Sequence, residues 1–131
     1  MGTIAVDWDS EDQRIVVWTF ARGWTWDDFR AASTESIALL NTVTHDAAVI
    51  FDINHTSLPQ GNAIHSLRSM QSVVQENVCK RIIVNADGFT TAIVRIVGQI
   101  YKLTGNTPLV FANSLDEARA MAQTDPCHFD S

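Results

Sequence analysis

The sequence has no long hydrophobic run and few cysteines. No apolar stretch approaches the roughly 20 residues that a membrane-spanning helix needs, and the first residues show no charged start followed by an apolar segment. The two cysteines, Cys79 and Cys127, lack the spacing of metal or redox motifs. We therefore expect no membrane insertion, reduced thiols and a cytoplasmic location.

Positive charge is also scarce. Nine Lys and Arg residues stand against fifteen Asp and Glu residues, which gives a formal net charge of -6. Nucleic acids and anionic membrane surfaces both require a basic footprint, so we expect neither as a partner. The four histidines lack the spacing of metal motifs, and the sequence has no Gly-rich phosphate loop. We therefore expect no metal and no cofactor.

Apolar residues make up 46% of the 131 residues, enough for the core of one domain, so we treat 1–131 as a single domain. Residues 3–20 alternate as a β-hairpin does. Symmetric pairing about its polar connection would place Ile4 opposite Trp18. In the next segment, Thr25 and Asp28 form a capping-box pattern for a helix that should end near Thr42.

Strand and helix patterns alternate along the remaining chain. We predict further strands at 47–53, 81–86 and 109–112, and further helices from about residue 60, from Asp87 to about Gly105, and from Ser114 to about Gln123. The order ββαβαβαβα predicts an α/β fold with a mixed, mostly parallel sheet, an N-terminal hairpin and four helices. Its core should include the following residues: Leu40, Ile50, Phe51, Leu67, Ile83, Val84 and Ile96.

Two apolar groups admit more than one interpretation. Trp24 and Trp26 flank the first helix start, where we expect them to close one end of the core, although they could also form a ligand-stacking platform. In the predicted third helix, Val94, Val97 and Tyr101 widen the apolar arc. That excess fits a partner surface, a lipid-like pocket or a wide core stripe. With the edge strand of the hairpin, it leads us to expect a homodimer.

A strand ending in Asp, a loop of about eight residues and a helix resemble a STAS domain. This is the family of anti-sigma-factor antagonists and sulfate-transporter C-terminal domains. The Trp-rich hairpin followed by GWTWDDF (23–29) is similar to the uncharacterised bacterial SpoIIAA-like branch. The resemblance implies a regulatory module that acts through protein–protein contact, with a regulatory kinase or an anti-sigma-like factor as partner.

The resemblance also implies where a phosphoacceptor serine would lie. In the antagonists it opens the helix some eight residues after the strand. Counting onward from FDIN (51–54) places Gln60 and Gly61 at the corresponding Asp-Ser positions. Gly61 has no hydroxyl, so the usual phosphorylation switch is not supported here.

We place the candidate site at this strand–loop–helix junction, because strand carboxyl ends and helix N-termini converge there. No G-x-S-x-G turn or ordered Ser-His-acid set is present, so we predict no catalytic residue and a non-enzymatic binding module. The alternative is a carrier with an apolar pocket between helices for a small molecule or lipid. The candidate partner- or ligand-binding residues are Asp52, Asn54, His55, Gln60, Gly61, Asn62 and Asp87.

Overall fold

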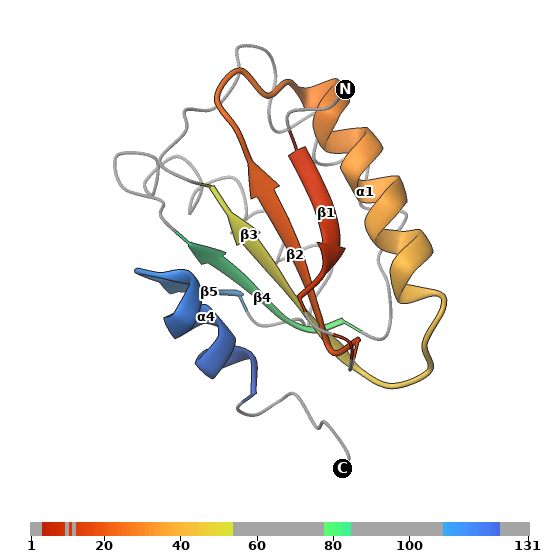
Figure 1. Cartoon of the computed structure of the whole chain (residues 1–131), viewed down its shortest axis with the longest axis vertical. Helices are drawn as coiled ribbons and strands as arrows, with labels where there is room; N and C mark the ends of the chain where they lie inside the picture. Colours follow the sequence, from red (N-terminus) through yellow and green to blue (C-terminus); the bar gives the residue numbers. More distant parts are fainter. Residues whose placement is uncertain (1–3, 10, 12, 54–77, 85–108, 124–131) are drawn as a thin grey trace.

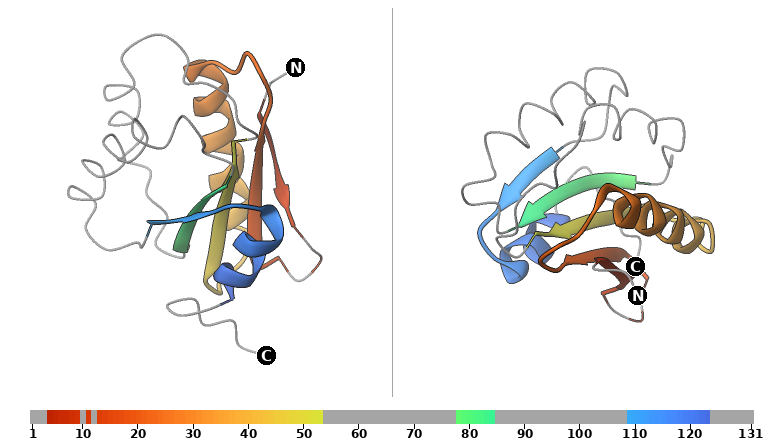
Figure 2. Two further views of the ribbon diagram at one scale, coloured as in Figure 1. Left: turned by 90° about the vertical axis from the view of Figure 1, so that its left-hand side faces the viewer. Right: turned by 90° about the horizontal axis from the view of Figure 1, so that it is seen from above.

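The computed structural model of the chain describes residues 4–9, 11, 13–53, 78–84 and 109–123. These residues form a mixed five-stranded sheet with one helix on each face (Figures 1 and 2). The predicted α/β class is therefore confirmed. The two helices predicted from about residue 60 and from Asp87 lie outside the described residues.

The five strands lie in the sheet in their sequence order. The first two pair antiparallel as a hairpin, and every later neighbour pair is parallel. This arrangement confirms the mostly parallel sheet with an N-terminal hairpin. The strands are β1 (Ile4–Trp8), β2 (Ile15–Phe20), β3 (Ala47–Asp52), β4 (Val78–Val84) and β5 (Leu109–Ala112).

The hairpin register differs from the symmetric prediction by two residues. Trp18 lies opposite Val6, whereas we predicted Ile4. The connection runs through residues 9–14, and Gln13 takes a positive φ of 56° within it. A shift of two residues leaves every side chain on its predicted face, because side chains alternate along a strand.

Helix α1 (Trp26–Leu40) begins as the capping pattern predicts. The Thr25 hydroxyl accepts a hydrogen bond from the Asp28 amide at 3.1 Å, and the Thr25 amide donates to the Asp28 carboxylate at 3.0 Å. The reciprocal bonds satisfy donors that a helix start leaves free. α1 packs over β1 and β2 (Figure 1).

Strand β4 begins three residues before the predicted start at residue 81. Ala47 pairs with Val78, but Ala48 pairs with Lys80, so Cys79 is an extra residue in this strand. Such a bulge breaks the two-residue alternation. Cys79 packs in the cluster on the face opposite α1, and Lys80 bonds to the helix on that same face. The sequence pattern therefore concealed the true start of the strand.

Helix α4 (Leu115–Ala122) covers the other face, against β3, β4 and β5 (Figure 2). Its predicted N-cap is confirmed, because the Ser114 hydroxyl accepts from the Glu117 amide at 3.1 Å. Neither described helix is long and apolar enough to cross a membrane.

The sheet separates two apolar layers. The α1 side holds an aromatic cluster, and the α4 side holds aliphatic strand residues with two alanines of α4. Of the predicted core residues, Phe51 is only partly buried, and Leu67 and Ile96 lie outside the described residues. The predicted core residues that are buried are Leu40, Ile50, Ile83 and Val84.

Candidate functional site

The predicted site begins at Asp52, the last residue of β3. In the sheet it pairs with Thr19 of β2 and Val84 of β4, and Val84 pairs in turn with Ala112 of β5, so these residues form one row across the sheet. Asp52 is only 8% exposed. By strand alternation it lies on the same face as Ile50, which packs in the layer under α4. The structure therefore places a buried carboxyl group at the carboxyl edge of the parallel strands.

The first turn of α4 begins close to this row. Its N-cap Ser114 follows Ala112 by two residues, and Asp116 and Glu117 are exposed in the first turn. These acidic groups suit the positive end of the helix. Among the described residues, this edge of the sheet therefore combines a buried carboxyl group with an acidic helix start.

The other candidate residues lie outside the described residues. Their proximity to Asp52 therefore stays a prediction. These residues are Asn54, His55, Gln60, Gly61, Asn62 and Asp87.

Lys80 is a buried charge that sequence reasoning missed. The residue is 4% exposed, and its Nζ donates a hydrogen bond to the Met121 carbonyl at 2.7 Å. That carbonyl lies in the last turn of α4, where the helix dipole favours a cation. Lys80 therefore joins the middle of the sheet to the end of α4. The bulge at Cys79 breaks the alternation of side chains between the two faces, so the sequence pattern did not indicate the face on which Lys80 lies.

The start of the hairpin connection is joined to the same helix. Arg119 donates from Nε to both Asp9 carboxylate oxygens, at 3.1 and 2.9 Å, and from Nη2 at 2.9 Å. Its Nη1 also donates to Asp116 at 3.1 Å. The hydrogen bond with Asp9 is the main reason why the pKa of Arg119 is raised. This two-pronged contact fixes α4 against the hairpin.

Arg81 has the opposite electrostatic environment. It pairs in the sheet with Val49, which packs in the layer on the α1 side, so its side chain belongs to that face. Burial lowers the pKa of the Arg81 guanidinium. Within the described part of the chain, no carboxylate forms an ion pair with it. Arg81 is therefore a half-buried charge without an acidic partner among these residues.

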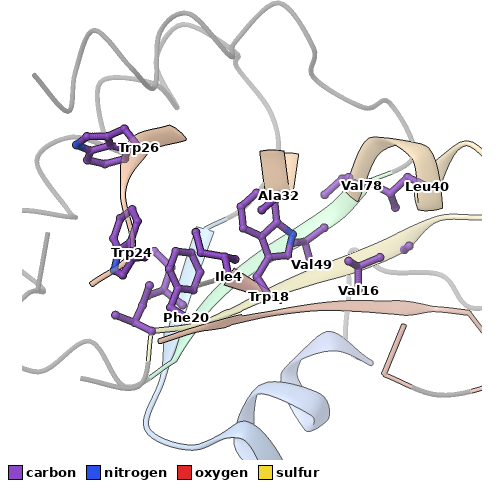
Figure 3. Close-up of a cluster of buried hydrophobic side chains, with 13 residues drawn as sticks. Ile4, Val16, Trp18, Phe20, Trp24, Trp26, Ala32, Leu40, Val49 and Val78 are labelled. Atoms are coloured by element: carbon purple, nitrogen blue, oxygen red, sulfur yellow. The ribbon is translucent and has the colours of Figure 1, made fainter. Parts of the chain in front are cut away.

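Trp24 and Trp26 belong to the aromatic cluster at the start of α1, which confirms their predicted core role. Their rings meet edge to face, with centroids 5.1 Å apart, and both residues are buried (Figure 3). The Trp26 Nε1 atom is buried and has no hydrogen-bond partner among the described residues. By contrast, Trp18 Nε1 donates to the Ser36 hydroxyl at 3.2 Å. Ser36 is buried on α1, a role that its polarity did not predict.

The prediction of reduced thiols is wrong for Cys79, which is disulfide-bonded. Cys127 lies outside the described residues. Disulfides persist mainly in oxidising compartments. The expected cytoplasmic location was based in part on reduced thiols, and the disulfide bond of Cys79 removes that support.

No metal-binding cluster is formed by the histidines, cysteines and acidic residues that the structure describes. His45, one of the four histidines, instead bonds through Nε2 to the Gln13 carbonyl at 2.7 Å. This contact holds the loop before β3 against the hairpin connection. No family model, curated protein or solved structure matches the chain.

Proposed function

We propose that the chain is a non-enzymatic, STAS-like binding or regulatory module that docks a protein partner at the carboxyl edge of its parallel strands. The observation that carries this proposal is the position of Asp52. A carboxyl group that is 8% exposed ends a strand whose other residues are apolar. Open α/β proteins gather their binding residues at the carboxyl ends of parallel strands, so a carboxyl group at this edge favours a role in binding.

The chemistry of the edge suggests what the partner offers. Carboxyl oxygens accept hydrogen bonds, so this edge favours a partner that supplies donors such as amides, Lys or Arg. The exposed carboxylates of Asp116 and Glu117 add negative charge at the nearby start of α4. A partner segment with a basic or amide-rich surface fits this edge. A regulatory kinase or an anti-sigma-like factor is the class of partner that the STAS resemblance implies.

Affinity purification from the native host tests this proposal. The wild-type chain and Asp52→Asn should be compared side by side, with Glu35→Gln as a control because this residue is exposed on α1, away from the proposed site. Thermal melts must first show that both variants fold. We expect a stoichiometric protein partner on the wild type and the control, with at least tenfold less on Asp52→Asn. Equal recovery on all three chains, or no partner on the wild type, would contradict the proposal.

We also propose that the module is a homodimer. The support is the wide apolar arc predicted for the third helix and the position of β1 at the end of the strand order, which makes it an edge strand. Analytical ultracentrifugation at tens of micromolar should therefore give the mass of two chains. A monomer at that concentration would contradict the homodimer, and the apolar arc would then belong to the core or to a pocket.

A second function is favoured by one observation on the other face of the sheet. The alternative of a small-molecule carrier concerns a pocket between helices that lie partly outside the described residues. Within the described part, however, Arg81 presents a guanidinium group without an acidic partner on an apolar layer. Native mass spectrometry of protein from its own host would separate the two functions, because it reports retained ligands and bound chains together.

A further inference from the structure

Two neighbouring residues of β4 carry positive charges toward opposite faces of the sheet. Lys80 donates to the last turn of α4, whereas Arg81 lies on the α1 side. The hydrogen bond of Lys80 gives that charge a clear structural role. Arg81 forms no such contact with any residue in the described ranges, so the architecture of the described sheet does not explain it.

The surroundings of Arg81 are apolar. Val49 lies beside it on β3, and the next row on the same face contains Phe51, Ile83 and Phe111. Val49 and Ile83 are buried, but Phe51 and Phe111 keep part of their surface exposed, as Arg81 does. The sheet therefore presents a half-buried cation beside partly exposed aromatic side chains.

We propose that Arg81 is the anion-binding residue of a ligand site on the α1 side of β3, β4 and β5, and that the site takes a small carboxylate with an apolar body. The guanidinium provides two parallel N–H donors that match the two oxygens of a carboxylate. The apolar body packs on Phe51 and Phe111. This site is on the opposite face from Asp52 and does not depend on partner docking at the carboxyl edge.

The electrostatics support this assignment. Burial lowers the pKa of Arg81, and no acidic group among the described residues opposes that effect. Arg119 provides the comparison within the same protein, because its hydrogen bonds to the Asp9 carboxylate raise its pKa. A bound carboxylate would do for Arg81 what Asp9 does for Arg119. Partial removal from water makes that pairing stronger than one at an exposed arginine.

The test uses octanoate and 1-octanol, which share an apolar chain and differ in the carboxylate. Isothermal titration should be run on the wild-type chain, Arg81→Gln, Arg81→Lys and the control Arg30→Gln. Arg30 is exposed on α1 and makes only a loose 3.8 Å contact with Asp27. Inorganic phosphate serves as an anion without an apolar body. Circular dichroism and thermal melts verify that each variant is folded.

We expect one octanoate per chain on the wild type and on Arg30→Gln, with at least tenfold weaker binding to Arg81→Gln. Arg81→Lys should retain part of the affinity, because the charge remains but the planar pair of donors is lost. Octanol should bind the wild type at least tenfold more weakly than octanoate does.

Three results would overturn the proposal. The first is equal octanoate affinity for the wild type and folded Arg81→Gln, and the second is no octanoate binding to the wild type at millimolar concentration. The third is phosphate binding as tight as octanoate binding, which would show that an apolar body does not contribute to binding. If Arg81→Gln does not fold, the comparison of octanoate with octanol on the wild type decides, since equal affinities would show that no cation engages the carboxylate.

Discussion

The Trp18 indole donates a hydrogen bond to the Ser36 hydroxyl at 3.2 Å and so joins the middle of β2 to α1 inside the aromatic layer. Both residues are 4% exposed. Ser36→Ala should lower the free energy of unfolding by about 1–3 kcal/mol, because it leaves a buried N–H without an acceptor. Urea denaturation followed by circular dichroism measures this loss.

Trp26 provides the matched control. Its Nε1 atom is also buried but has no acceptor in the described part of the chain, so Trp26→Phe removes no hydrogen bond there and should change the stability by less than about 1 kcal/mol. Equal losses for Ser36→Ala and Trp26→Phe would show that the Trp18–Ser36 bond contributes little.

The sequence predicted the features that depend on local chemistry. The capping residues Thr25 and Ser114 hold the helix starts, because a cap needs only a side-chain oxygen and an amide a few residues away. The continuous apolar strand β3 is likewise buried on both faces. These elements place Asp52 at the edge of the sheet, as predicted.

Features that depend on distant pairing were missed. The bulge at Cys79 exists only in relation to β3, and the burial of Ser36 depends on Trp18, which is distant in sequence. The half-buried Arg81 was missed for the same reason, because a charged residue in a short strand resembles a solvated strand end. Of the predicted site residues, Asp52 alone is among the described residues, and the arrangement of the others stays a prediction from the sequence.

The contact between Arg119 and Asp9 should contribute measurably to stability. A double-mutant cycle with Asp9→Asn and Arg119→Gln should give a coupling energy of about 1 kcal/mol, because the guanidinium bonds both carboxylate oxygens and the Asp9 side chain is only 14% exposed. The control cycle uses Arg30 and Asp27, whose side chains are 51% and 92% exposed. That pair should show coupling near zero. Similar coupling energies in the two cycles would show that the contact between Arg119 and Asp9 contributes no more than an exposed ion pair.

Reduction should destabilise the protein through Cys79. Because Cys127 is the other cysteine of the sequence, we expect a bond within one chain to join the two and to close a long loop. Loss of such a cross-link typically costs about 2–4 kcal/mol. Dithiothreitol should lower the urea midpoint of the wild type to that of Cys127→Ser, which itself should not respond. Two reactive thiols in the denatured, unreduced protein would contradict the bond, and a disulfide-linked dimer would place it between chains.

The position of Gly61 predicts that no phosphorylation switch operates at the start of the second predicted helix. This residue lies outside the described ranges, so the prediction depends on the sequence alone. A phosphate would be favoured at a helix N-terminus, but it needs a hydroxyl that glycine lacks. Incubation with kinases from the host followed by intact-mass analysis should show no stable phosphorylated form. A stoichiometric phosphate on Thr56 or Ser57 that changes partner affinity would restore the switch at a shifted position.

The last prediction concerns the energetic cost of Arg81. Burial lowers its pKa, so the charged form is less favourable in the folded chain than in the unfolded chain. A base whose pKa is lowered on folding destabilises the folded chain at every pH below its folded pKa. The contribution of Arg81 to the free energy of unfolding should therefore be unfavourable and constant between pH 5 and 9. Arg81→Met, which keeps the apolar stem and removes the charge, should therefore raise the free energy of unfolding by about 1 kcal/mol.

Urea denaturation at pH 5, 7 and 9 measures this gain, which should be the same at the three pH values. Arg81→Lys is the control, because it keeps a positive charge at the same place and should give no gain. Octanoate should stabilise the wild type and leave Arg81→Met unaffected, because only the wild type retains the guanidinium that pairs with the carboxylate. A loss of more than about 1 kcal/mol in Arg81→Met would mean that the native fold already satisfies this charge, and Arg81 would then be a structural residue.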